Sequence, residues 1–63
     1  MNNIDKIRLK KHLSYGVIAK EAELTPTYIH LLAKSKRTNP SLDAMKKISL
    51  ALGEKVGYVF PTT

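Results

Sequence analysis

The chain has 63 residues, which is enough for one small domain and too few for two. It contains no cysteine, so disulfides and cysteine-based metal sites are excluded, and no apolar run approaches the roughly 18 residues of a membrane-spanning helix. Eleven Lys and Arg residues against five Asp and Glu give a net charge of +6. This excess favours a polyanionic partner, with nucleic acid ahead of an anionic membrane surface.

The first predicted element is a short amphipathic helix over residues 3–11. Asn3 can cap this helix, and Asp5 would lie in its first turn, near the positive end of the helix dipole. Ile4 and Ile7 recur at the i, i+3 spacing of a buried helical face.

Two further short helices are expected over residues 14–23 and 26–34. Thr25-Pro26 is a strong start signal, because Thr caps a helix and Pro fits its first position, where no N–H is needed. Leu24 closes the earlier helix and fills the turn between the two. The residues expected to face inward are Val17, Ile18, Ala19, Ala22, Ile29 and Leu32.

A polar, basic loop over residues 35–40 leads to a fourth helix. Asn39 precedes a proline and is therefore expected to be extended, and the helix should begin at Pro40 or Ser41. Gly53 ends it, as Gly commonly does just past a helix C-terminus. An apolar stripe at 3-3-4 spacing is formed by Leu42, Met45, Ile48 and Leu52.

The tail over residues 54–60 fits two conformations. Val56, Val59 and Phe60 have the spacing of a helical turn, but β-branched residues also allow a strand with Val56, Tyr58 and Phe60 on one side. We favour the helical turn. The predicted fold class is therefore all-α, a compact bundle of four short helices plus a C-terminal turn in one domain over residues 1–63.

The second and third helices, joined by a tight turn, form a helix-turn-helix arrangement with the small Ala19 where the two helices approach. The stretch from Leu13 to Phe60 follows the pattern of a known family of such domains. The residues that carry the match are Leu13-Ser14, Ile18-Ala19-Lys20, Leu24-Thr25-Pro26-Thr27-Tyr28-Ile29, Lys36-Arg37-Thr38-Asn39-Pro40-Ser41-Leu42, and Ile48 through Ala51-Leu52-Gly53. With these residues the chain resembles the Cro and phage-repressor (xenobiotic-response-element) type of helix-turn-helix domain, which has a lambda-repressor-like fold.

Several residues depart from the pattern of that family. Tyr15 stands where the family usually has Gln, and Tyr can still donate a hydrogen bond to a phosphate. His12 and Glu23 stand where Gly is common, which costs stability if φ is positive there. An ion pair between the first and third helices is also common. Arg8 keeps the basic partner but Ala33 replaces the acid, so Arg8 is either paired elsewhere or free for phosphate.

The resemblance implies that the third helix enters the DNA major groove by its N-terminal end. Thr27 is the strongest candidate for reading a base edge. Leu31 is a second, although it could equally belong to the core, and Pro26 is a third with a structural alternative. The residues expected at phosphates are Tyr15, Thr25, Tyr28, His30, Lys34, Lys36, Arg37 and Asn39. A solvated charged loop is the alternative for the basic residues, and helix capping is the alternative for Thr25 and Asn39.

These features predict a sequence-specific regulator of transcription in the reducing cytoplasm, a repressor that binds double-stranded DNA at a palindromic operator as a homodimer. The expected dimer patch is Leu50, Val56, Tyr58 and Phe60, with a satellite part of the core as the alternative. The second functional hypothesis is an antitoxin or antirepressor that binds a protein partner, which the few residues after Phe60 disfavour. No enzyme activity, cofactor, metal or small-molecule ligand is expected, because no cofactor loop or nucleophile–base pair is visible.

Overall fold

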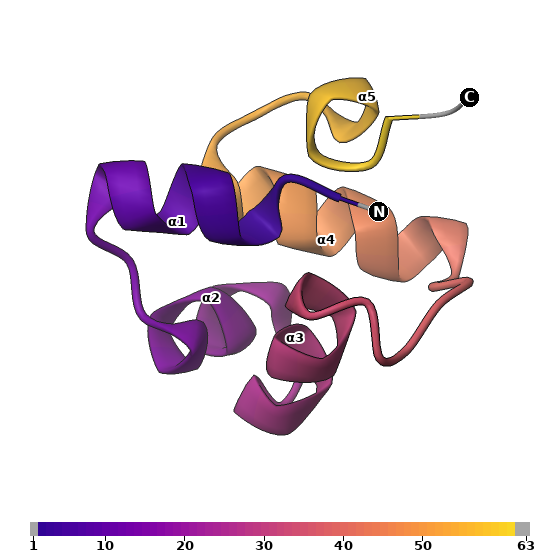
Figure 1. Cartoon of the computed structure of the whole chain (residues 1–63). Coiled ribbons are helices and arrows are strands. Elements are labelled where there is room, and N and C mark those ends of the chain that lie inside the picture. The colour runs from indigo at the N-terminus through magenta and orange to yellow at the C-terminus, as the bar shows by residue number, and fades with distance from the viewer. Residues whose placement is uncertain (1, 62–63) are drawn as a thin grey trace.

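The structure, a computed structural model, describes residues 2–61 and consists of helices joined by short connections (Figure 1). No strand occurs among these described residues, so the all-α fold class is confirmed and the tail forms a helical turn instead of a strand. The helices are α1 (Ile4–Lys11), α2 (Tyr15–Ala22), α3 (Pro26–Ala33), α4 (Leu42–Leu52) and α5 (Val56–Val59).

The helices form a bundle in which α2 packs against both α3 and α4. In Figure 1, α2 and α3 lie below α1 and α4, and α5 lies above them. The N-terminal segment holds α5 in place, because the Asn3 backbone N–H donates to the Val59 carbonyl at 2.8 Å. The Asn3 side-chain amide also donates to the Tyr58 carbonyl at 2.7 Å. The two ends of the described chain therefore meet at one side of the bundle.

Three helices begin with hydroxyl caps, of which the sequence predicts the one at Thr25. Ser14, Thr25 and Ser41 each accept a 3.1 Å hydrogen bond from a backbone N–H three residues later, which contributes about 1 kcal/mol per cap. Asn3 occupies the N-cap position of α1, as expected, but its side chain makes no capping hydrogen bond. The Asn2 carboxamide oxygen accepts from the Ile4 N–H instead, at 3.1 Å, because the Asn3 amide is used on α5.

Left-handed residues end three of the helices. His12 and Glu23 both have φ of 58°, and Gly53 has φ of 71°. The concern about the two non-Gly residues is therefore confirmed, since an L side chain is strained in this region. Asn39 also has φ of 58°, which contradicts the extended conformation expected before proline. Asn is among the residues that tolerate this conformation best, and it allows the loop to turn back toward α4.

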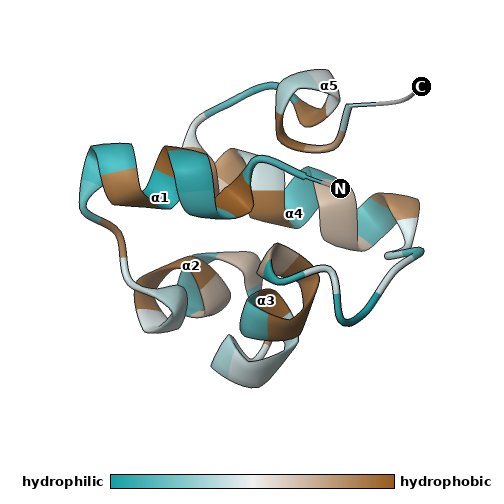
Figure 2. Ribbon diagram, viewed as in Figure 1, coloured by the Kyte–Doolittle hydropathy of each residue, from teal (hydrophilic) through white to brown (hydrophobic). Residues whose placement is uncertain are grey.

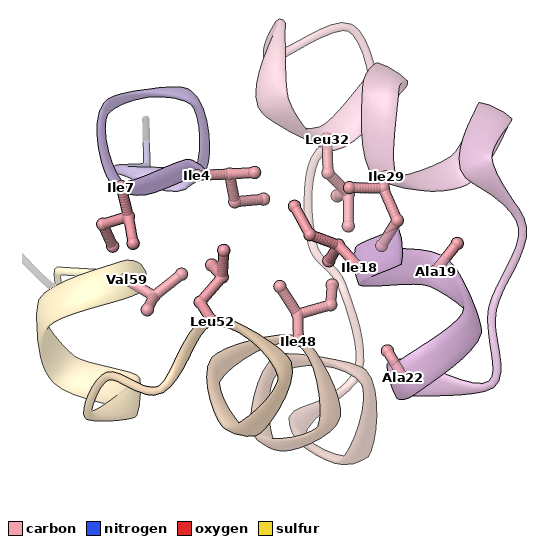
Figure 3. Packing of buried hydrophobic residues seen from close by; sticks show 10 residues of the cluster. All are labelled: Ile4, Ile7, Ile18, Ala19, Ala22, Ile29, Leu32, Ile48, Leu52 and Val59. Atoms are coloured by element: carbon pink, nitrogen blue, oxygen red, sulfur yellow. The ribbon is translucent and has the colours of Figure 1, made fainter. Parts of the chain in front are cut away.

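All five helices contribute to one hydrophobic core (Figure 3). Its fully buried residues are Ile4, Ile7, Ile18, Ala19, Ala22, Ile29, Leu32, Ile48, Leu52 and Val59. Each large aliphatic side chain among them contributes about 1.5–3 kcal/mol by leaving water. The apolar sides of the helices turn toward this core, whereas α1 and the loop after α3 carry hydrophilic residues (Figure 2).

Three residues expected in the core lie outside the core cluster, and they are Val17, Leu42 and the half-buried Met45. Val17 is 49% exposed, because the buried face of α2 is centred on Ile18 and Ala22 and leaves Val17 one residue, or about 100°, to the side. Leu42 is 59% exposed, since it is the first residue of α4 and extends past the end of the core. Ala44 is buried in its place.

Candidate nucleic-acid interface

The turn between α2 and α3 holds these two helices at a close, fixed distance. Ala19 is buried at their contact, and its carbonyl accepts a 2.8 Å hydrogen bond from the Leu24 N–H. Leu24 packs its side chain against the core. The left-handed Glu23 lets the chain reverse in the few residues between the helices. The unit is therefore built from backbone geometry and one small side chain, as the sequence predicts.

The N-terminal end of α3 is open to solvent. Thr25, Pro26 and Thr27 are all exposed there, at the positive end of the helix dipole. The Thr25 hydroxyl accepts from the Tyr28 N–H and keeps its own proton for an outside acceptor. Leu31 is half-buried and stands outside the core cluster, so its side chain remains partly available at the surface.

The basic loop after α3 folds back onto the end of that helix. The backbone N–H groups of Lys36 and Arg37 both donate to the Leu31 carbonyl, at 2.9 and 3.1 Å. The Arg37 guanidinium lies 4.9 Å from the centre of the Tyr28 ring, a cation–π contact that places this charge beside α3. Within residues 2–61, neither Lys36 nor Arg37 has a carboxylate partner.

The most connected polar group is the Asp5 carboxylate, which joins three helices. Its Oδ1 accepts from the Tyr15 hydroxyl at 2.6 Å and from the Arg8 Nε at 2.9 Å. Its Oδ2 accepts from the Lys34 Nζ at 2.8 Å. Partial burial by itself would raise the pKa of Asp5, but the hydrogen bonds from Lys34, Tyr15 and Arg8 outweigh it and lower that pKa to about 2. Asp5 is therefore firmly ionised at neutral pH.

Tyr15 is fixed within this cluster by two further contacts. The Arg8 guanidinium lies 4.1 Å from the centre of the Tyr15 ring, and the His30 ring packs edge-on at 5.3 Å between centroids. Arg8 also donates to the Leu13 carbonyl at 3.3 Å. The open question about Arg8 is thus answered, because it is paired with an acid of its own helix and is not free.

The cluster uses two residues that the sequence suggested for phosphate contact. Tyr15 and Lys34 both bind Asp5 in the structure, whereas Thr25, His30, Lys36 and Arg37 remain exposed. Sequence reasoning did not single out Asp5 as a site residue. The i, i+3 spacing of Asp5 and Arg8 was a usable signal for that pair. No local signal connects Asp5 with Lys34, which lies 29 residues further on.

The model of the helix-turn-helix family matches residues 4–59, which covers all five helices. The chain belongs to the helix-turn-helix family, in its Cro and phage-repressor type. No match was found among curated proteins. The family is one of DNA-binding domains, so this helix-turn-helix chain is a DNA-binding regulator with DNA as a partner. Within residues 2–61, no helix is long and apolar enough to span a membrane.

The residues suggested for dimer contact lie on α4 and in the segment around α5. Leu50 is 84% exposed and Tyr58 is 44% exposed, so both are available to a partner. Val56 and Phe60 are half-buried, and Phe60 packs against the core. Phe60 also lines a groove of about 320 Å³ beside the basic loop, together with Asn39 and others. The suggested patch thus contains two exposed residues, Leu50 and Tyr58, and two half-buried residues, Val56 and Phe60.

Proposed function

We propose that this helix-turn-helix chain is a sequence-specific repressor of transcription that acts as a single cytoplasmic domain and binds a palindromic operator as a homodimer. The observation that carries the proposal is the surface around α3. The N-terminus of α3, with Thr27, is open, and the loop that follows the helix carries Lys36 and Arg37, whose charges are not neutralised within residues 2–61. The Arg37 guanidinium lies over the ring of Tyr28, the residue after Thr27. Such a surface suits the major groove at its centre and the phosphate backbone at its edge.

In this proposal the residues divide into base readers and phosphate contacts. Thr27 hydrogen-bonds a base edge, Leu31 contacts a thymine methyl, and Pro26 lies against the groove floor. Phosphates are bound by Thr25, Tyr28, His30, Lys34, Lys36, Arg37 and Asn39. Tyr15 is left out of this set, because its hydroxyl proton is donated to Asp5. Repression follows by occlusion, since a dimer across the operator denies the same DNA to polymerase. Leu50, Val56, Tyr58 and Phe60 form the contact between the two copies.

The direct test is selection of bound sites from random duplex DNA, followed by a salt titration with the selected site. We expect an enriched inverted repeat, and a log–log slope of affinity against salt of roughly −5 to −9 for the dimer. A single unpaired half-site would contradict the homodimer. A flat salt response would contradict binding through phosphates.

A further inference from the structure

The Asp5 carboxylate and a DNA phosphate offer the same chemistry to Lys34. Both are anionic oxygens that accept a charge-assisted hydrogen bond from an ammonium group. In the structure Asp5 already holds that ammonium, at 2.8 Å. Asp5 occupies one of the three ammonium donors and offsets its charge, so a phosphate that binds Lys34 competes with Asp5 for this group.

The geometry allows this exchange at Lys34. Its side chain is 46% exposed and ends a flexible four-carbon stem, and its ammonium is the group bound to Oδ2. Arg8 and Tyr15 occupy the other oxygen, Oδ1. When Lys34 leaves, Asp5 keeps one cation and one hydroxyl donor, so no unpaired charge is left at a half-buried position.

Arg8 and Tyr15 are held more firmly than Lys34. The Arg8 side chain is 20% exposed, stacks on the Tyr15 ring and donates to the Leu13 carbonyl. The Tyr15 ring is confined between Arg8 and His30. Lys34 is thus more exposed than Arg8 and is held by fewer contacts than either Arg8 or Tyr15.

We propose that Asp5 is an internal competitor for DNA, which holds the Lys34 ammonium in the free protein and releases it to a backbone phosphate in the complex. This inference rests on the proposed function, and it adds Asp5 as a residue that lowers the affinity of the chain for DNA. The competitor weakens binding to any duplex, because its carboxylate offsets the Lys34 charge and holds the ammonium on the protein.

The test compares Asp5→Asn with Asp43→Asn, using fluorescence anisotropy on a short random-sequence duplex. Both changes remove one negative charge, but Asp43 is 77% exposed and pairs with Lys47 on α4, away from the cluster. We expect Asp5→Asn to bind about two- to five-fold more tightly per subunit than Asp43→Asn, the factor that corresponds to releasing an exposed ion pair. In a Lys34→Ala background this gain should disappear.

Three results would overturn the competition while leaving DNA binding in place. Asp5→Asn could bind no more tightly than Asp43→Asn, it could bind more weakly, or its gain could persist in the Lys34→Ala background. If neither the parent chain nor any variant binds duplex, the proposed function itself is wrong and the competition falls with it.

A second measurement covers the case in which Asp5→Asn is too unstable to use. The Lys34 side-chain resonances of the parent chain are followed by NMR as duplex is added. When the protein is saturated with duplex, the chemical shifts of the Lys34 side chain should change more than that of the Arg8 Nε–H. Lys34 resonances that stay unchanged at saturating duplex would overturn the proposal.

Discussion

Asp5 on α1 and Lys34 at the end of α3 form an ion pair of 2.8 Å across 29 residues of sequence. The resemblance implies an acid on the third helix as the partner of Arg8, and Ala33 occupies that position. The structure contains a pair between the same two helices with the charges exchanged, because the acid lies on α1 and the base just after α3. The connection between α1 and α3 is thereby kept with different residues.

The Asp5 cluster predicts a loss of stability in acid. The folded pKa of Asp5 is about 2, against an ordinary value of 3.8, so its contribution is complete above pH 4 and is lost as pH falls toward 2. With allowance for solvent screening of a partly exposed group, we expect this contribution to be about 1 kcal/mol. Urea unfolding of the parent chain and of Asp5→Asn at several pH values measures it. If the free energy of unfolding fell equally steeply in both proteins between pH 4 and pH 2, the loss of stability would not come from Asp5.

Glu23 gives a test of backbone strain. Because its φ is 58°, Glu23→Gly should raise the free energy of unfolding by about 0.5–1 kcal/mol. The contact it loses, with Lys47 at 3.8 Å, is exposed and contributes little. The control is Glu21→Gly, which should cost about 1 kcal/mol because Glu21 lies within α2. A loss of stability in both variants would mean that residue 23 is not strained.

The helices were predictable because their signals are local. Ser14, Thr25 and Ser41 mark the starts and Gly53 marks an end. The left-handed conformation of Glu23 was suggested by the resemblance, since Gly is common at that position in the family. Periodicity fixes which side of a helix is apolar, but not how far the core extends along it. For this reason Val17 and Leu42 were assigned to the core although both are exposed.

The candidate site was predictable only where it lies on one segment. Thr27 and the loop with Lys36 and Arg37 follow directly from the helix-turn-helix pattern. The engagement of Lys34 by Asp5 depends on how α1 and α3 pack, and the sequence contains no local trace of that packing. Phe60 could likewise be placed in a patch or in the core until the position of α5 was known.

The proposed division between readers and phosphate contacts predicts two kinds of variant. Thr27→Ala should reduce the discrimination between the preferred base and the other bases at one or two base pairs, by about 1–3 kcal/mol. Leu31→Ala should have a similar effect. Lys36→Ala should weaken binding to all sequences alike and reduce the salt slope by about one per subunit. Competition binding on single-base variants of the selected site distinguishes them. A change of base preference in Lys36→Ala alone would reverse the assignment.

The packing between α2 and α3 can be tested at Ala19. Ala19 is 1% exposed between α2 and α3, so Ala19→Leu should overfill the contact and cost about 1–3 kcal/mol. Its neighbour Lys20 is exposed, and Lys20→Leu should change stability by no more than about 0.5 kcal/mol. Thermal unfolding of the two variants provides the comparison. Equal midpoints would show that the helices can separate without cost.

The dimer patch leads to a prediction for which Leu50 is a better probe than Phe60. Phe60 packs against the core, so Phe60→Ala should lower stability as well as remove the contact. Leu50 is 84% exposed and supports no part of the fold, so Leu50→Ser leaves the domain intact. One recognition helix reads only a few base pairs, and two must meet successive major grooves about 34 Å apart.

A contact built on so few exposed side chains is small, and a small interface implies a weak dimer that becomes stable on DNA, where both copies are held together. We therefore expect the parent chain to sediment as a monomer at micromolar concentration and yet to occupy paired half-sites cooperatively. Leu50→Ser should abolish this cooperativity while leaving binding to one half-site unchanged. Leu9→Ser is the matched control, since Leu9 is 61% exposed on α1 and lies outside the patch. If Leu50→Ser keeps full cooperativity, or if Leu9→Ser loses it, the copies meet through a different surface.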